Sequence, residues 1–349
     1  MKIAVVTEHF PHHNIKTSDE NMINYINYDL VIKPVRRAPW FELTRRLRFK
    51  ADTYLKQRAG MTGYELATAV TELKVFIRTL GRRFLVHFNV GDVNCKFFPF
   101  YKGRNMVMAT YHQPPDFFCN FFKKCGHIER LDAAVVTSNV ITDVISKYVN
   151  KDRIFYLPVS VDVDFFKPSE KLKDPDAKKI CVCVGSWLRD FETMREIVKL
   201  FAGRGGVEFH IIAAEMNRRH FAGLPNARFF SGLPLAEYLE EIHNADLLVI
   251  PLKSCTSNLA VVEGMAVGLP IVASDVGGIR DYVKDSFAVL HKKGDHRAMA
   301  DSIDGLLADP GKRKEMSARA REHSLNFSWE AASARLIKVY EGLGATVRR

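Results

Sequence analysis

The stretch LKSCTSNLAVVEGMAVGLPIVASDVGGI, residues 252–279, decides the fold. A polar loop at 254–258 leads into an apolar run at 259–267, and a Gly-Leu-Pro turn then leads into the strand-like residues 271–273. Another strand-like run, 247–251, precedes the loop. Strand, loop, helix, turn and strand in this order form the unit from which parallel α/β sheets are built.

One acid, Glu263, lies inside the apolar run. A buried carboxylate costs several kcal/mol unless it is paired or hydrogen-bonded. This cost makes Glu263 the first candidate for a ligand contact. The alternative is a structural role, in which the positive end of the helix dipole stabilises the carboxylate.

The same alternation of strands and helices runs through the whole chain. A length of 349 residues suggests two domains, at roughly 100–200 residues each. Strands are expected near 2–7, 28–32, 84–88, 105–110, 133–138 and 154–158, and again near 180–185, 207–213, 227–230, 245–251, 271–273 and 286–290. The pattern predicts two doubly wound parallel sheets, in which ligands gather at the carboxyl ends of the strands. His87 and His112 fall at two such ends.

Helices are predicted between the strands. Residues 62–80 have apolar side chains close to the helical period, among them Leu73 and Ile77. The runs 191–201, 235–243, 296–308 and 312–325 also have helical character, and 329–343 forms a terminal amphipathic helix.

The composition is that of a globular protein, with 47% hydrophobic and 26% charged residues. No run approaches the roughly 18 apolar residues needed to span a bilayer. The N-terminal MKIAVVTEHF has too short an apolar run for a signal peptide and predicts a first strand. The six cysteines have neither disulfide nor metal-ligand spacing, so a cytoplasmic location is expected.

The net charge of +11 favours an anionic partner such as a nucleotide or a phospholipid, with diffuse solvation as the alternative. Nine Lys and Arg residues lie in the segment 33–58 against two acids. Trp40, Leu43 and Leu47 are interleaved with them, a pattern typical of a segment on an anionic membrane surface. A helix packed on the protein's own core with a basic solvated side also fits. No basic-aromatic recognition module is visible, so no nucleic-acid partner is expected.

Five stretches carry a resemblance to a known family. The most specific is 263–278, EGMAVGLPIVASDVGG. The others are VDVDFFKP at 161–168, Gly185 with RDFET at 189–193, FSGL at 230–233 and FSWE at 327–330. Together they resemble the retaining, nucleotide-sugar-dependent glycosyltransferases with the GT-B fold, of the large family 4 type. The likeness covers about 135–343 and is weaker over the first 130 residues.

The resemblance implies two Rossmann-like domains that face a central cleft. Residues 1–165 are expected to form the acceptor-side domain, 178–328 the nucleotide-sugar-binding domain and 166–177 the linker. The closing helix, about 329–349, is expected to pack back on the first domain. A sugar would pass from a UDP- or GDP-sugar to a hydroxyl acceptor with its anomeric configuration retained, without a metal or other cofactor.

The resemblance also assigns residues. It gives Glu263 the ribose hydroxyls, Arg189 the diphosphate and His112 the orientation of the transferred sugar, and these three are the expected catalytic residues. The other donor-binding residues are expected to be Gly185, Ser186, Gly232, Leu233, Cys255, Thr256, Ser257, Asn258 and Leu259. His87 and Asp92 are expected on the acceptor side together with His112. No metal ligands are expected.

Two positions depart from the family pattern. Cys255 stands where the family has the first Glu of its Glu-x7-Glu motif, which contacts the donor sugar. Ser186 stands where a second diphosphate-binding Arg is usual, and Arg218 or Arg219 is the candidate replacement. These departures leave the identity of the donor sugar open.

The main hypothesis is a retaining transferase in cell-envelope or exopolysaccharide synthesis. It would act on a glycan or lipid-linked acceptor, at the inner face of the cytoplasmic membrane. One alternative is another GT-B enzyme, such as a nucleotide-sugar epimerase or a phosphorylase. The other is a non-catalytic relative that binds a sugar or nucleotide, which the two departures favour.

Overall fold

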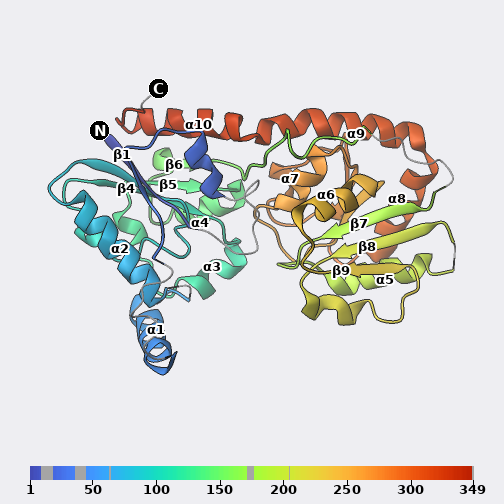
Figure 1. Cartoon of the computed structure of the whole chain (residues 1–349), viewed down its shortest axis with the longest axis horizontal. Helices are drawn as coiled ribbons and strands as arrows, with labels where there is room; N and C mark the ends of the chain where they lie inside the picture. Colours follow the sequence, from blue (N-terminus) through green and yellow to red (C-terminus); the bar gives the residue numbers. More distant parts are fainter. Residues whose placement is uncertain (9–18, 36–44, 63, 171–176, 204, 348–349) are drawn as a thin grey trace. The chain divides into compact units, whose positions relative to one another are not determined.

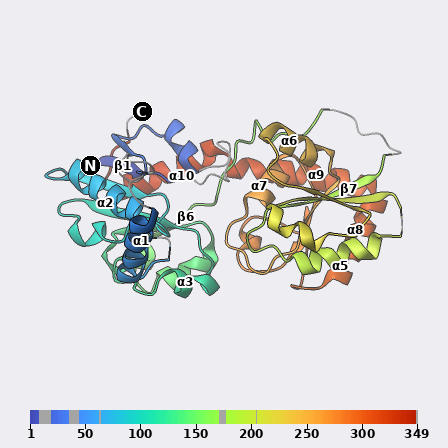
Figure 2. The same ribbon diagram turned by 60° about the horizontal axis from the view of Figure 1, so that its bottom comes forward.

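The computed structural model describes residues 1–8, 19–35, 45–62, 64–170, 177–203 and 205–347. The chain divides into two compact units, which Figures 1 and 2 show from two directions. Unit 1 comprises Met1–Val159 with Trp329–Arg349, and unit 2 comprises Ser160–Ser328. Residues 160–165, assigned to the first domain from the sequence, therefore cluster with unit 2.

Unit 1 is built on a six-stranded parallel sheet. Its strands are β1 (Lys2–Val6), β2 (Leu30–Ile32), β3 (Phe84–Phe88), β4 (Met106–Tyr111), β5 (Ala133–Val136) and β6 (Ile154–Tyr156). They lie in the order β2-β1-β3-β4-β5-β6. The sheet grows from β1 to one side with β2 and to the other with β3, so its topological switch point lies between β1 and β3, where doubly wound sheets bind ligands.

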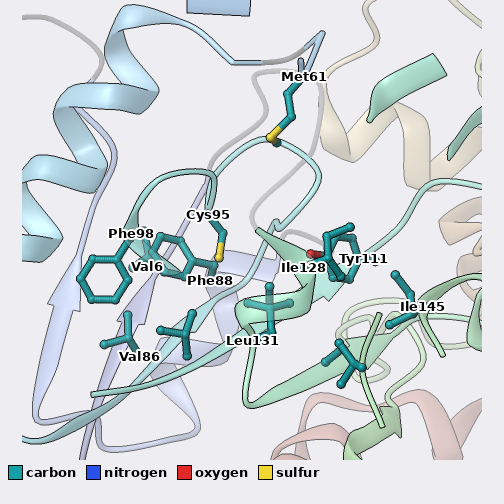
Figure 3. Packing of buried hydrophobic residues seen from close by; sticks show 14 of the residues in the cluster. Val6, Met61, Val86, Phe88, Cys95, Phe98, Tyr111, Ile128, Leu131 and Ile145 are labelled. Atoms are coloured by element: carbon teal, nitrogen blue, oxygen red, sulfur yellow. The ribbon is translucent and has the colours of Figure 1, made fainter. Parts of the chain in front are cut away.

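Both faces of this sheet are covered, and successive strand residues alternate between two cores. Val6, Val86 and Phe88 pack with Phe98 and Tyr111 in one core, which Figure 3 shows from close by. Ile3 and Leu85 point to the other face, where they join the terminal helix through Trp329, Leu336 and Tyr340. This double burial explains the nearly unbroken apolar runs of the strands.

The helices of unit 1 are α1 (Arg45–Ala59), α2 (Leu66–Thr79), α3 (Pro115–Phe121), α4 (Thr142–Ile145) and α10 (Trp329–Gly342). Short 3-10 turns at Asp19–Asn24, Phe98–Tyr101, Ile128–Arg130, Asn139–Ile141 and Lys151–Arg153 complete the unit. Of the basic segment 33–58, residues 36–44 lie outside the described residues, and α1 forms most of the remainder.

Unit 2 has a second parallel sheet, of strands β7 (Lys179–Val184), β8 (Val207–Ile212), β9 (Ala227–Phe230), β10 (Leu247–Ile250), β11 (Ile271–Ser274) and β12 (Ala288–His291). Their order is β12-β11-β10-β7-β8-β9. This is the strand order of the dinucleotide-binding Rossmann fold, with the switch point between β7 and β10.

The helices of unit 2 are α5 (Phe191–Phe201), α6 (Leu235–Asn244), α7 (Leu259–Ala266), α8 (His296–Ala308) and α9 (Pro310–Ser324). Its 3-10 turns are Glu215–His220, Ile279–Asp281 and Leu325–Phe327. The predicted bounds of β3, β9, α5 and α8 are confirmed. In the part of the chain that the structure describes, no helix is both long and apolar enough to cross a membrane.

Candidate functional site

The candidate donor site lies at the switch point of unit 2. Gly185–Asp190 follow β7, and residues 251–258 follow β10, the neighbouring strand. The two loops are hydrogen-bonded, because Lys253 N–H donates to the Leu188 carbonyl at 2.9 Å and Asp190 N–H to the Pro251 carbonyl at 2.9 Å. The sheet topology therefore brings together two sets of residues that are about 65 positions apart in the sequence.

Arg189 is held by its own loop and by the loop after β10. Its Nε donates to the Val184 carbonyl at 2.6 Å, and its Nη2 donates to Asn258 Oδ1 at 3.0 Å. Gly185 has φ +92°, and a Cβ there would stand 2.7 Å from Arg189 Nη2, so the glycine makes room for the guanidinium. Burial lowers the pKa of Arg189, although the charge on a guanidinium survives such a shift.

The loop 275–278, which follows β11, contacts the loop 254–258 through its backbone. Gly278 N–H donates to the Cys255 carbonyl at 2.8 Å. A Cβ on Gly277, which has φ +52°, would lie 2.0 Å from that carbonyl oxygen. The glycine at 277 is therefore explained by a close approach to the loop at 254–258.

Glu263 is 6% exposed in the middle of α7, and Tyr238 on α6 donates its hydroxyl to the Glu263 carboxylate. Burial raises the pKa of Glu263 to about 7, while the Tyr238 hydrogen bond and the Arg189 charge act in the opposite direction. The buried acid thus has one protein partner and titrates near neutral pH. Sequence reasoning missed Tyr238, because nothing in its local sequence shows that α6 meets α7.

Cys255, one of the expected donor-binding residues, lies in the loop that follows β10. Its side chain is buried, and burial raises the pKa of the thiol to about 12, so the thiol is neutral at physiological pH. Cys255 contributes a backbone carbonyl to the loop contact instead. The neighbouring Thr256 has a buried hydroxyl oxygen without a hydrogen-bond partner, so this loop retains an unused polar atom.

Other expected donor residues lie in the same two loops or after β9. Ser186 Oγ accepts the N–H of Ala214 at 2.8 Å, at the end of β8. Gly232 and Leu233 follow β9 and lead into α6, two strands away from β7. The proposed replacement Arg218 is exposed and paired with Glu215, at 3.0 Å from Nη2 to Oε2.

In unit 1, Asp92 after β3 and His112 after the neighbouring β4 form a hydrogen-bonded pair. Asp92 Oδ2 accepts from the His112 backbone N–H at 2.7 Å and lies 3.1 Å from His112 Nδ1. The Asp92 side chain is 2% exposed, whereas that of His112 is 20% exposed. The carboxylate therefore fixes the ring from the inside while part of the ring stays accessible.

His87 does not share this arrangement. It is 1% exposed, its Nδ1 lies 2.7 Å from the Tyr340 hydroxyl and its Nε2 lies 2.8 Å from Thr110 Oγ1. That His87 meets the acceptor stays a prediction, for a ring that has little exposed surface in this structure. A strand-end histidine whose next residues turn the chain looks accessible in the sequence, but α10 covers this one.

Several buried polar atoms in the loops after β1, β3 and β4 have no hydrogen-bond partner among the residues that the structure describes. They are Thr7 Oγ1 after β1, Asp92 Oδ1 and Asn94 Oδ1 after β3, and Gln113 Oε1 after β4. All four follow adjacent parallel strands, so they lie along one edge of the sheet. Among the described residues of either unit, no group of three or more His, Cys, Asp or Glu side chains is placed to hold a metal ion.

Solved structures share this topology over nearly the whole chain. Sucrose-phosphate synthase from Thermosynechococcus elongatus matches with a TM-score of 0.74 at 16% identity, over 98% of this chain and 99% of that one. Anabaena HepE in complex with UDP and glucose matches with a TM-score of 0.72 at 12% identity, over 98% and 100% of the two chains. This chain has the GT-B fold. At such identities the likeness establishes the fold alone.

The match to a family model falls on unit 2. Residues 215–323 match the family model described as Glycosyl transferases group 1. This segment is similar to the glycosyl transferases group 1 family. D-inositol 3-phosphate glycosyltransferases from Xylanimonas cellulosilytica and Thermobispora bispora are 40% identical over 106 residues and 39% identical over 97 residues. These matches cover 30% and 28% of this chain, and 25% and 23% of the relatives, so the chain spans about a quarter of their length.

The group 1 segment contains only part of the site. Tyr238, the loop 254–258 and Glu263 lie inside it, whereas Arg189 precedes it. The Asp92–His112 pair lies in unit 1, outside the matched residues 215–323, so for this pair the comparisons show only the GT-B fold.

Proposed function

We propose that this GT-B protein is a glycosyltransferase that moves a sugar from a nucleotide diphosphate sugar to a hydroxyl acceptor. The observation that carries the proposal is the presence of Arg189 and Glu263 at the switch point of unit 2. A guanidinium suits a diphosphate, and a carboxylate can accept both hydroxyls of a ribose. The glycosyltransferase relatives of the group 1 segment and the UDP in HepE support this reading.

Each donor-site group has a part in the proposed reaction. Glu263 accepts the ribose hydroxyls in its ionised form. Arg189, together with the backbone N–H groups at the start of α7, stabilises the negative charge that develops on the leaving diphosphate. The reaction is proposed to need no metal ion, because these donors supply the positive charge.

On the acceptor side, His112 is the proposed contact with the transferred sugar, and Asp92 is its positioning residue. The hydrogen bond from Nδ1 to Asp92 keeps the proton on that nitrogen and makes Nε2 the basic atom of the ring. The product is proposed to keep the anomeric configuration of the donor.

The acceptor is proposed to be a glycan or a lipid-linked glycan of the cell envelope or an exopolysaccharide. The enzyme would work in the cytoplasm at the inner face of the membrane, with the basic segment 33–58 toward the lipid. The net charge of +11 supports this location.

The binding step can be tested by titrating UDP, GDP and ADP in a calorimeter. One nucleotide should bind, and Glu263→Gln should weaken its binding by at least tenfold, since a charge-assisted hydrogen bond contributes about 1.5–3 kcal/mol. Glu237→Gln, on the exposed side of α6, is the matched control and should bind like the wild type. Failure of all three nucleotides to bind at millimolar concentration would refute the proposal.

The chemical step needs a separate experiment. Nucleotide sugars of the base that binds are incubated with the protein, with and without EDTA, and released nucleotide is measured by mass spectrometry. Release that EDTA does not affect, with a product of unchanged anomeric configuration by NMR, is expected.

A second candidate function is nucleotide-sugar binding without transfer. The buried, neutral Cys255 favours it, because the site lacks a carboxylate at that position. Nucleotide binding without any release of nucleotide from the full set of sugars would establish this candidate instead.

A further inference from the structure

Helix α2 has an unusual distribution of apolar side chains. Its inward face packs Val75 and Phe76 on the core and also buries Thr68, Thr71 and Thr79. Three further large aliphatic residues face outward: Leu73 is 55% exposed and Ile77 is 62% exposed, and Leu80 at the C-cap is 64% exposed. A helix on the surface of a globular protein normally has polar side chains on that side. We call Leu73, Ile77 and Leu80 the α2 stripe.

The inward face of α2 is fixed by hydrogen bonds. The buried carboxylate of Glu72 accepts the N–H groups of Phe97 and Phe98, each at 2.6 Å. The hydroxyls of Thr71 and Thr79 donate to carbonyls one turn earlier, both at 2.8 Å. Turning the helix to bury the stripe would break the Glu72 contacts and leave the N–H groups of Phe97 and Phe98 without this acceptor. The exposure of the stripe is therefore built into the fold.

Positive charge surrounds the stripe. Residues 45–83 contain ten Lys and Arg against three Asp and Glu, a net charge of +7 out of +11 for the whole chain. Lys74 and Arg78 each follow a stripe residue directly, and Arg82 and Arg83 lie just beyond its end. Because neighbours in a helix are about 100° apart, these cations flank the apolar side chains.

Helix α1 adds aromatic side chains to the same unit. Phe49 is 72% exposed and Tyr54 is 62% exposed, and the exposed Lys50 and Arg58 lie on the same helix. α1 contacts α2, and in Figure 1 it stands out from the rest of unit 1. Exposed apolar and aromatic groups among cations are the features of a surface that inserts shallowly into a lipid interface.

We propose that α1 and α2 form a docking surface for an anionic lipid bilayer, in which the α2 stripe enters the interface and the flanking cations meet the headgroups. This goes beyond the basic segment 33–58, because it assigns the apolar anchor to α2. A second copy of the chain fits less well, since it would bring two patches of +7 together. The surface carries none of the donor-binding residues, so the proposal stands independently of the transfer reaction.

The test is sedimentation of the full chain with lipid vesicles. The wild type should sediment with vesicles of mixed phosphatidylglycerol and phosphatidylcholine and remain in solution with phosphatidylcholine alone. Arg78→Glu/Arg82→Glu/Arg83→Glu should lower the binding constant by about a hundredfold or more, since each cation near an anionic surface contributes roughly fivefold. Leu73→Ser/Ile77→Ser/Leu80→Ser should lower it at least tenfold, because transferring each side chain from water contributes ~1 kcal/mol or more.

Unit 2 supplies matched controls for both variants. Lys292→Glu/Lys293→Glu/Arg297→Glu makes the same change in net charge at exposed positions, and Leu200→Ser/Met216→Ser/Leu325→Ser removes the same kind of exposed apolar side chain. Both controls should bind vesicles with the same binding constant as the wild type to within a few fold.

Three results would overturn the proposal. The wild type could remain in solution with anionic vesicles, as expected if the surface serves an acidic protein. The charge-reversal control in unit 2 could lose as much binding as Arg78→Glu/Arg82→Glu/Arg83→Glu, which would mean that diffuse charge attraction holds the protein on the vesicle. Sedimentation velocity could show a dimer that the serine triple dissociates, which would assign the stripe to a second copy.

Discussion

Replacing Glu263 with Gln should remove a pH-dependent destabilisation of the ligand-free protein. Burial raises the pKa of Glu263 from 4.5 to about 7, so the folded state holds this proton more tightly than the unfolded chain does. The protonated carboxyl favours folding fully below pH 4.5, and this contribution is lost as the pH rises toward 7. Above that pH the folded protein retains a buried carboxylate that the unfolded chain would solvate.

The size of the effect follows from the two pKa values. At roughly 1.4 kcal/mol per unit, the shift from 4.5 to about 7 corresponds to about 3 kcal/mol, most of it between pH 5 and pH 8. Gln does not titrate, so the free energy of unfolding of the variant minus that of the wild type should grow by about 2–3 kcal/mol over this range. Any fixed cost of the buried amide cancels in this difference.

The assay is urea unfolding of both proteins at pH 5 and pH 8, followed by circular dichroism. Glu237→Gln, at an exposed position on α6, should show no pH-dependent difference beyond a few tenths of a kcal/mol. If the variant and the wild type keep the same difference at both pH values, Glu263 is not an acid of raised pKa, and the argument from its burial fails.

Three further predictions concern single contacts. Tyr238→Phe removes the hydrogen bond that favours the ionised carboxylate, so the pH midpoint of nucleotide binding should move upward in calorimetric titrations; an unmoved midpoint would show that the hydroxyl does not act on the carboxylate. Asp92→Asn should lower the turnover number by about a hundredfold and leave nucleotide affinity unchanged, because it acts through the orientation of His112. Tyr340→Phe should cost about 1–3 kcal/mol of unfolding free energy by leaving His87 Nδ1 buried without its partner. Equal nucleotide binding by this last variant and the wild type is expected, and weaker binding would give the buried His87 a functional role after all.

The sheet topology of both units was predictable because burial on both faces leaves a strong trace in the sequence. A run such as Phe84–Phe88 is buried throughout and apolar except for His87, and each run ends in a polar loop. A parallel sheet sends all these loops to one edge, so strand order and loop position together locate Arg189 and the loop at 254–258.

Individual side chains were harder to place, because a side chain's role depends on residues distant in the sequence. His87 and His112 both end strands, yet α10 buries the first and the Asp92 carboxylate holds the second partly exposed. Glu263 was recognisable as a buried acid, but its partner Tyr238 lies on a different helix. Cys255 was recognisable only as a departure, and its buried thiol became apparent with the loop contact to Gly278.

Helix α2 shows the limit of periodicity most clearly. A period of 3.6 identifies a helix and the spacing of its apolar side chains, but it does not say which face meets the core. Here the core side is decided by Glu72, whose carboxylate must receive the N–H groups of the loop after β3. While Glu72 makes these contacts, Leu73 and Ile77 lie on the outward side of the helix. An apolar surface that folding itself enforces, on the most basic part of the chain, is best explained by a partner outside the chain.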